Sequence, residues 1–218
     1  MPERTIENRL REEYFDLLPV IRQVTLHLET IIRYRTLSIL RDLKPYEQVV
    51  VKSRVKEYES AKNKLLRPQE GDVFDPDKSE EYSILKLRDL AGVRVLVFPH
   101  DRLKEVDQKL GENEPFKNWT SDPVKYARGF VQAPKYYGFC SEVSHIVQGE
   151  YQIIPMLIGH FWEVEHSAMY KPAGWAKGAD KDHDMKTLRA KVECSLLRFE
   201  REFERFAKKN AQPPSETP

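Results

Sequence analysis

Apolar residues in the first forty positions of the chain recur at steps of three and four, which is the spacing of one apolar face on an α-helix. We expect Pro19 to end a first short helix or to begin a second one, and Pro45 to close the helical section. A similar stripe predicts one long amphipathic helix from Met185 to Lys209. The apolar positions are Leu17, Ile21, Val24, Leu28, Ile31 and Ile32 in the first section and Leu188, Val192, Leu196, Leu197, Phe199, Phe203 and Phe206 in the last.

β-Branched residues dominate several short runs between these two sections. The segment 47–55, EQVVVKSRV, predicts a strand, and residues 56–66 then return to helical spacing. The run from Val93 to Phe98 predicts a strand buried on both faces, after a short helix and a turn at Ala91 and Gly92. Further strands are expected at 124–132, 141–148 and 150–158, the last with a bend at Pro155, and residues 133–140 are expected to form a loop.

The remaining segments complete one α+β domain. We expect Asp101 to cap the N-terminus of a helix over 101–111 and Gly111 to cap its C-terminus. Residues 159–171 have helical spacing, and 69–81 is rich in turn formers. The pattern predicts a mixed sheet of about five strands flanked by helices. The predicted ranges are 1–210 for the domain, 1–44 for its N-terminal helical section, 45–175 for the sheet with its helices, 182–209 for the C-terminal helix and 210–218 for a disordered tail.

The composition narrows the class of protein. The 218 residues are 33% charged but carry a net charge of only +1, which weighs against a DNA coat protein or a polybasic membrane binder. No apolar run approaches the roughly 20 residues that span a bilayer, and the charged N-terminus lacks a signal-peptide pattern. Cys140 and Cys194 have no metal-ligand spacing, so we expect free thiols in a reducing cytosol. These features predict a cytoplasmic protein without a membrane segment.

A local excess of positive charge breaks this balance, because residues 41–67 contain eight Lys or Arg against four Asp or Glu. Arg54 lies at the end of the predicted strand and Lys56 two residues further on, so in an extended chain they share a face. Ser60 and Lys64 are four apart in the helix that follows and also share a face. Two cations thus meet a helix N-terminus, whose free N–H groups favour anions. The arrangement predicts a polyphosphate site, whereas a solvated basic helix would not explain cations on a strand.

Two later strands carry polar residues that suit phosphate chemistry. Asp89 stands just before the strand that contains Arg94, and an acid at a strand edge can hold Mg²⁺. Taken alone, an ordinary turn aspartate would explain Asp89 better. Glu150 and Gln152 share one face of a later strand, while Tyr151 can pack on the other. Because a core-facing carboxylate is costly without a partner, we expect Glu150 to lie beside a metal ion and a substrate hydroxyl.

In their order and spacing these segments resemble the synthetase domain of RelA/SpoT-type alarmone synthetases, and in length the chain is similar to the small stand-alone members. The matching segments are R-V-K-x-x-x-S-x-x-x-K at Arg54–Lys64, D-L-A-G-V-R-V at Asp89–Val95, P-K-x-x-G-F-x-S at Pro134–Ser141, E-x-Q-I at Glu150–Ile153, and the run Phe161–Lys171. The resemblance implies a nucleotidyltransferase-like mixed sheet. It also implies a pyrophosphokinase, which transfers pyrophosphate from ATP to the 3′-hydroxyl of GDP or GTP.

The resemblance further implies roles for individual residues. Asp89 and Glu150 would hold Mg²⁺ as the cofactor. Glu150 would also take the proton from the ribose 3′-hydroxyl, and Gln152 would orient the acceptor. The implied binding residues are Arg54, Lys56, Ser60, Lys64 and Arg94 for the ATP phosphates, and Lys135, Phe139, Ser141 and His145 for the acceptor.

The acceptor loop departs from the family pattern N-G-Y-x-S-x-H. Phe139 replaces the tyrosine that stacks on guanine, His145 comes two residues late, and Ile154 stands where an arginine usually follows E-x-Q-I. The acceptor therefore stays open between GDP or GTP and, in a toxic variant, an adenosine nucleotide or the tRNA 3′ end. A non-catalytic nucleotide-binding regulator is a third alternative, against which the intact catalytic set argues. The resemblance also admits a homo-oligomer and a cognate antitoxin as partners.

Overall fold

The structure is a computed structural model, and it describes residues 5–66, 80–112, 114–122, 133–169 and 179–210. Residues 166, 168–169 and 179–186 are described in their backbone only. The helices are α1 (Ile6–Arg41), α2 (Tyr58–Leu66), α3 (Leu103–Gly111), α4 (Met156–Met169) and α5 (Ala179–Asn210), and the strands are β1 (Gln48–Val55), β2 (Ala91–Phe98), β3 (Thr120–Ser121), β4 (Lys135–Phe139) and β5 (Gln148–Pro155).

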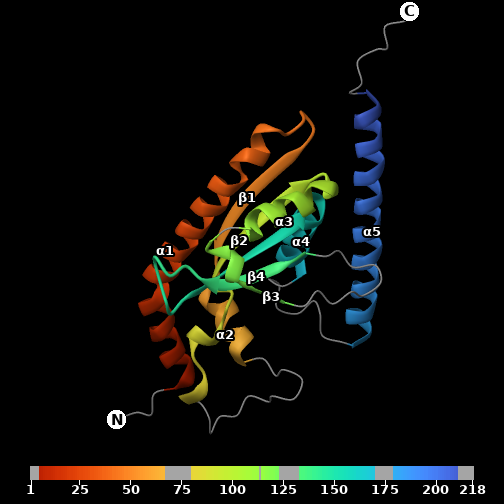
Figure 1. Cartoon of the computed structure of the whole chain (residues 1–218). Helices are drawn as coiled ribbons and strands as arrows, with labels where there is room; N and C mark the ends of the chain where they lie inside the picture. Colours follow the sequence, from red (N-terminus) through yellow and green to blue (C-terminus); the bar gives the residue numbers. More distant parts are fainter. Residues whose placement is uncertain (1–4, 67–79, 113, 123–132, 170–178, 211–218) are drawn as a thin grey trace, which may run out of the picture.

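The five strands form one mixed sheet in the order β1-β2-β5-β4-β3 (Figure 1). β2 and β5 are parallel, and the other neighbouring strands are antiparallel. A parallel pair needs a long crossover connection, here the segment that runs through α3 and β4. The expected α+β fold with a mixed sheet, N-terminal helix and long C-terminal helix is confirmed.

The N-terminal section is one helix rather than two. Thr5 caps α1 by accepting a hydrogen bond from the amide of Asn8, and the helix then continues through Pro19 to Arg41. Pro19 is exposed, so water can reach the carbonyl that loses its intrahelical partner. The expected break at Pro19 was therefore wrong.

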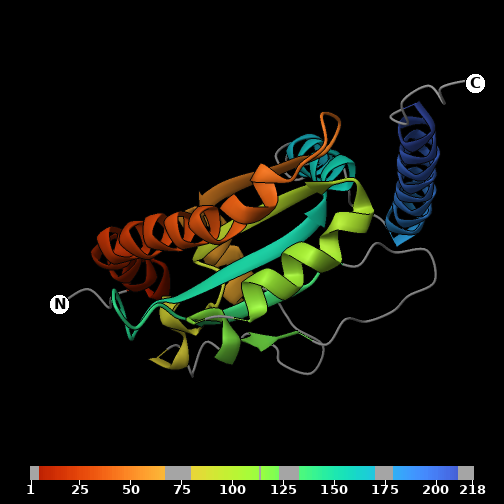
Figure 2. The same ribbon diagram turned by 45° about the horizontal axis from the view of Figure 1, so that its top comes forward.

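α1 and α3 cover one face of the sheet, as Figures 1 and 2 show. Every second residue of the central strands points into this layer, which is the alternation that a strand imposes. The main core consists of apolar residues from α1, α3 and these strands, among them Leu10, Ile21, Val24, Leu28, Val93, Val95, Val106, Leu110, Tyr151 and Ile153.

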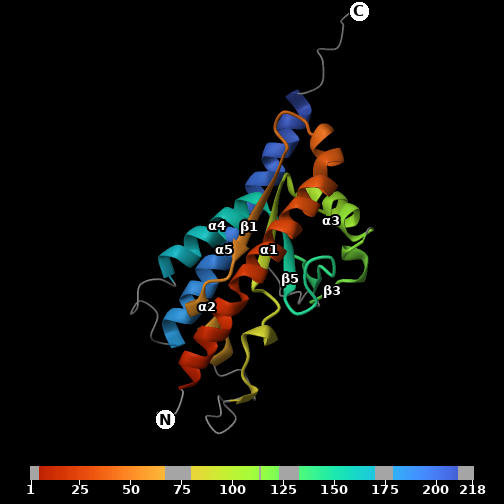
Figure 3. The same cartoon turned by 90° about the vertical axis from the view of Figure 1, so that its left-hand side faces the viewer.

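α4 and α5 lie on the side of the sheet opposite to α1 (Figure 3). A smaller apolar cluster forms beneath them from Leu96, Ile154, Met156 and Ile158, with Leu196 and Leu197 of α5 packed against it. Leu96 and Ile154 face each other across β2 and β5 near the ends of these strands. This cluster covers only one end of the face and leaves the other end to polar residues.

Residues 133–148 have the opposite structure to the expected one. The expected loop contains β4, and the expected strand at 141–148 is a turn that begins with the amides of Val143 and Ser144 donating to the carbonyl of Cys140. β4 forms because it pairs with β5 and because Gly138 leaves room for Trp119. A Cβ at Gly138 would lie 2.4 Å from the Trp119 ring. Tertiary packing thus overrides the local turn signal of the glycine.

Three smaller expectations were also wrong. Ala91 and Gly92 belong to β2, so the turn lies just before them. Asp101 lies inside a 3-10 helix, and α3 begins at Leu103 without a side-chain cap. β5 does not bend at Pro155 but ends there, and α4 follows at once. The segment 124–132 lies outside the described residues, as do most of 69–81 and of the tail.

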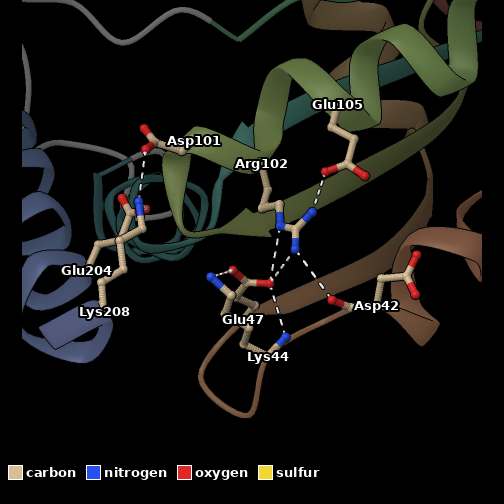
Figure 4. Close-up of polar contacts among 8 residues, drawn as sticks. All are labelled: Asp42, Lys44, Glu47, Asp101, Arg102, Glu105, Glu204 and Lys208. Carbon is tan, nitrogen blue, oxygen red and sulfur yellow. Dashed lines mark hydrogen bonds and ion pairs between the residues drawn. The ribbon is translucent and has the colours of Figure 1, made fainter. Parts of the chain in front are cut away.

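A network of charged residues joins the start of β1 to the end of β2 (Figure 4). The Arg102 guanidinium donates to a Glu47 carboxylate oxygen through Nε at 3.1 Å and through Nη2 at 2.8 Å, and it also binds Glu105. On α5, Lys208 pairs with Glu204, and Lys208 Nζ lies 3.8 Å from Asp101 Oδ2. These contacts hold together the start of β1 and the end of β2. The polar residues of the sheet lie toward the opposite ends of these two strands.

Candidate active site

The predicted catalytic glutamate lies in a row of residues that crosses four strands. Arg54 of β1 is opposite Gly92 of β2, Gly92 is opposite Glu150 of β5, and Glu150 is opposite Tyr137 of β4. Directly opposed residues point to the same face of a sheet. The face is the one that α1 does not cover, since the alternate residues Val93 and Tyr151 belong to the α1 core.

A second row lies two residues further along each strand on the same face. It consists of Lys52, Arg94, Gln152 and Lys135, which are opposed in that order. Two rows of polar side chains therefore occupy this half of the face, and the apolar pair Leu96 and Ile154 begins where α4 and α5 cover it. The sheet thus gathers residues from four separate segments of the chain into one polar surface.

Glu150 and Gln152 are almost completely buried in this surface. Their exposed fractions are 8% and 5%. The side chain of neither residue makes a hydrogen bond or ion pair with any residue that the structure describes. Because burying an unpaired charge or amide destabilises a fold, these groups are suited to a ligand that supplies the missing partners.

Asp89 holds two lysines at the beginning of β2. Its Oδ2 accepts hydrogen bonds from Lys56 Nζ at 3.0 Å and from Lys64 Nζ at 2.9 Å, whereas Oδ1 is buried without a partner among the described residues. Burial alone would raise the pKa of the Asp89 carboxyl, but the charges of the two lysines outweigh it and lower that pKa. The structure therefore brings Lys56, Lys64 and Asp89 together.

The predicted donor residues differ in their surroundings. Lys56 follows directly after β1, and its side chain is buried against Asp89. Burial lowers the pKa of Lys56, with Arg54 and Lys64 adding to the effect and Asp89 opposing it. Arg54 is exposed on β1, and Ser60 is exposed on α2 four residues before Lys64.

Arg94 lies at the centre of the cationic part of the surface. Burial and the charge of Arg54 lower the pKa of the Arg94 guanidinium, while Glu163 and Glu150 act against this shift. The Arg94 side chain makes no hydrogen bond or ion pair within the described part of the chain. An anion bound here would relieve the repulsion between Arg54 and Arg94.

The predicted acceptor residues divide into two groups. Lys135 belongs to the second row, and Phe139 ends β4 with 41% of its surface exposed. Ser141 and His145 are exposed in the turn after β4, beyond the paired strands, so the rows do not include them. The turn also contains Cys140, whose buried thiol has its pKa raised to about 11.

Sequence reasoning missed a cluster around Tyr137. The Tyr137 hydroxyl donates to Asp122 Oδ2 at 2.9 Å, and Arg88 pairs with Asp122 Oδ1 at 3.1 Å. The Arg88 guanidinium also stacks 4.3 Å above the centre of the Tyr137 ring. This cluster lies beside Glu150, and a predicted loop at residues 133–140 gives no indication of it. Lys52 was also missed, although its two-residue spacing to Arg54 indicated a shared face.

Two carboxylates are available for the expected Mg²⁺. No group of three or more metal-ligating side chains occurs among the residues that the structure describes. Mg²⁺, however, usually binds one or two carboxylates together with substrate phosphates. The unpartnered Oδ1 of Asp89 and the unpaired carboxylate of Glu150 fit this mode of binding.

None of the described helices has the length and apolarity that crossing a bilayer requires.

Comparisons with known proteins identify the fold. No family model matches the chain, and no curated protein matches it in sequence. Among solved structures, small alarmone synthetase 1 from Bacillus subtilis bound to its product pppGpp is 18% identical, with a TM-score of 0.66 over 92% of this chain and 100% of that one. The same protein bound to AMPCPP aligns with a TM-score of 0.61 at 18% identity, over 91% of this chain and 99% of that one.

A GTP pyrophosphokinase family protein from Streptococcus pneumoniae is 20% identical, with a TM-score of 0.60 over 91% of this chain and 96% of that one. The chain therefore has the fold of the small alarmone synthetases over nearly its whole length. This confirms the architecture that the sequence resemblance implied.

Proposed function

We propose that this protein is a small alarmone synthetase of the RelA/SpoT type, which transfers pyrophosphate from ATP to the 3′-hydroxyl of GDP or GTP. The observation that carries the proposal is the buried, unpaired Glu150 in a row with Arg54, on a face that is otherwise mainly cationic. A carboxylate among cations suits a reaction in which one group takes a proton and others neutralise phosphate charge. The shared fold with a protein bound to pppGpp supports the same reading.

In this proposal the donor phosphates lie against Arg54, Lys56, Lys64 and Arg94. Guanidinium and ammonium groups bind phosphate oxygens strongly because both partners are charged. Asp89 holds Lys56 and Lys64 by one oxygen and thereby keeps two flexible side chains in one place. Ser60, one turn before Lys64 on α2, would add a hydroxyl donor to the same phosphates.

Glu150 acts as the base in the proposed reaction. The 3′-oxygen of the acceptor forms a bond to the β-phosphorus of ATP, the bond from that phosphorus to the α–β bridging oxygen breaks, and AMP leaves. Glu150 takes the proton of the 3′-hydroxyl, and the amide of Gln152 on the same strand face orients the acceptor. Fixed alignment of the two substrates supplies much of the rate in such transfers.

The residues present fit Mg²⁺ as the cofactor, with Asp89 and Glu150 as the residues that would hold it. When bound, the ion would neutralise charge on the phosphates. On the acceptor side, Phe139 would stack on the base and Lys135 would contact the phosphates, with Ser141 and His145 as further contacts from the turn. In the same proposal the protein acts in the cytoplasm, and a homo-oligomer and an antitoxin remain predicted partners.

The test is thin-layer chromatography with labelled ATP and separate GDP, GTP, AMP and deacylated tRNA acceptors. We expect a pyrophosphorylated product with GDP or GTP. Product only with AMP or tRNA would show that the acceptor is not a guanine nucleotide but one of these alternatives. Nucleotide binding without any product would support the non-catalytic regulator.

Glu150→Gln is the decisive variant in this assay. It keeps the shape of the side chain but removes the base, so transfer should fall by roughly a hundred- to ten-thousandfold. Glu202→Gln on α5 is the matched control, since it removes the same charge far from the site. Transfer at the wild-type rate by Glu150→Gln would contradict the role of Glu150 as base.

A further inference from the structure

The second row of the polar face carries more positive charge than the roles above explain. Three of its four members are cations, and two of these, Lys52 and Arg94, are directly opposed on β1 and β2. Like charges at opposed positions of one sheet face destabilise the pair. The row therefore needs negative charge, either from the protein or from a ligand.

Glu163 of α4 supplies this charge at Lys52. Lys52 Nζ donates to the two carboxylate oxygens of Glu163 at 2.9 and 3.2 Å, and the same carboxylate lies 3.5 Å from His160 Nδ1. The negative charge of Glu163 also favours the charged form of Arg94, because it opposes the lowering of the Arg94 pKa. A single carboxylate thus pairs with Lys52 and acts through its charge on the opposed Arg94.

We infer that Lys52 and Arg94 form a further subsite for the polyphosphate of the donor nucleotide, in which Glu163 takes the place of a phosphate until the ligand displaces it. The Lys52 and Glu163 side chains are 39% and 35% exposed, so the pair is open to solvent. Exposed ion pairs of this kind contribute about 1 kcal/mol or less to stability. A polyphosphate, which carries several charges, can therefore replace the carboxylate.

The position of Lys52 indicates which substrate it serves. Lys52 and Arg54 are two apart on β1 and share a face, which separates them by roughly 7 Å along the strand. A chain of two or three phosphates spans such a distance. Lys135, at the other end of the row, lies three strands away. The subsite therefore belongs to the donor side, and for the identity of its ligand it rests on the proposed function.

The test is calorimetric titration of the full chain with tripolyphosphate and with a non-hydrolysable ATP analogue. Glu163→Gln should bind both probes about tenfold more tightly, because Lys52 is then free to contact phosphate. Lys52→Met should weaken binding, since Glu163 then lies unpaired beside the ligand. The double variant should lose the gain of Glu163→Gln. Glu202→Gln, which removes the same charge from an ion pair with Arg205, should bind like the wild type.

The possible results separate this inference from the proposed function. Wild-type affinity in Glu163→Gln, or an equal gain with and without Lys52, would show that the pair only fixes α4 to β1 and would overturn the subsite. Failure of both wild type and Glu163→Gln to bind tripolyphosphate would overturn it as well. Tighter binding without any product from labelled ATP would contradict the proposed function but support the subsite.

Discussion

Arg54 and Glu150 lie in one row of the sheet with only a glycine between them. Gly92 is opposite both residues, so no side chain separates the cation on β1 from the carboxylate on β5. The gap is where the proposed donor phosphates and the acceptor hydroxyl would meet. The missing side chain of Gly92 therefore leaves room for a substrate between Arg54 and Glu150.

Gly92→Ala should fold but lose activity. The added Cβ would lie 3.6 Å from the Arg54 carbonyl oxygen and 4.0 Å from its Nε, which are ordinary contacts. The methyl group would nevertheless enter the gap, and a displacement of about 1 Å at the reacting atoms can reduce turnover roughly a hundredfold. Turnover with labelled ATP and thermal unfolding measure the two effects separately.

Gly138→Ala is the contrasting variant. Its Cβ would lie 2.4 Å from the Trp119 ring, so the change should destabilise the fold by about 1–3 kcal/mol. An inactive but fully stable Gly92→Ala beside an unstable Gly138→Ala is the expected result. Undiminished turnover in Gly92→Ala would mean that substrates do not occupy the gap.

Arg54→Ala and Lys56→Ala should both weaken ATP binding but differ in stability. The loss of a charge-assisted phosphate contact typically costs about 1.5–3 kcal/mol. Arg54 is exposed, so its removal should leave unfolding unchanged. Removing Lys56 leaves the buried Asp89 with Lys64 alone, so the protein should also lose stability. Calorimetry with ATP and urea unfolding test the pair, and unchanged ATP affinity in both variants would contradict the donor site.

Phe139→Ala should affect one substrate only. Phe139 is exposed at the end of β4, and a base stacked on an aromatic ring gains roughly 1–3 kcal/mol. The Michaelis constant of the acceptor should therefore rise far more than that of ATP. Phe199→Ala, an exposed phenylalanine on α5, is the control. Equal changes in both constants would show that Phe139 acts on the fold rather than on the acceptor.

The proposed donor residues could be singled out from the sequence because their signals are local. Arg54 is in β1 and Lys56 follows directly after it, and Ser60 and Lys64 are four apart on α2, so each spacing acts within a few residues of the chain. The same holds for Glu150 and Gln152. The shared face of each of these pairs can be predicted without knowing which strands are neighbours in the sheet.

The rest of the surface depends on strand register, which no single segment contains. Tyr137 faces Glu150 only because β4 pairs with β5 in one register, and the local pattern of residues 133–140 predicts a loop rather than β4. The opposition of Lys52 and Arg94 likewise follows from the register of β1 and β2. At Pro19 a strong local signal gave the wrong prediction. The proline predicts a helix break, but α1 continues through it as one long packed helix.

Glu200 should make the stability of the protein depend on pH. It lies on α5 with only 1% of its surface exposed, and burial, with the charges of Glu204 and Asp101, raises its pKa from 4.5 to about 7. The folded protein thus holds the proton more tightly than the unfolded chain does. The contribution of Glu200 to stability is therefore complete below about pH 4.5 and is lost as the pH rises from there to about 7.

Glu200→Gln should remove this dependence, because the amide stays neutral at every pH. The variant should be more stable than the wild type by about 3 kcal/mol at pH 8 and nearly equal to it close to pH 4. Urea unfolding at both pH values measures the difference, with the exposed neighbour Glu202→Gln as the control. A Glu200→Gln variant that follows the wild-type pH profile would show that this carboxyl is ionised in the folded protein and that α5 packs without a proton on it.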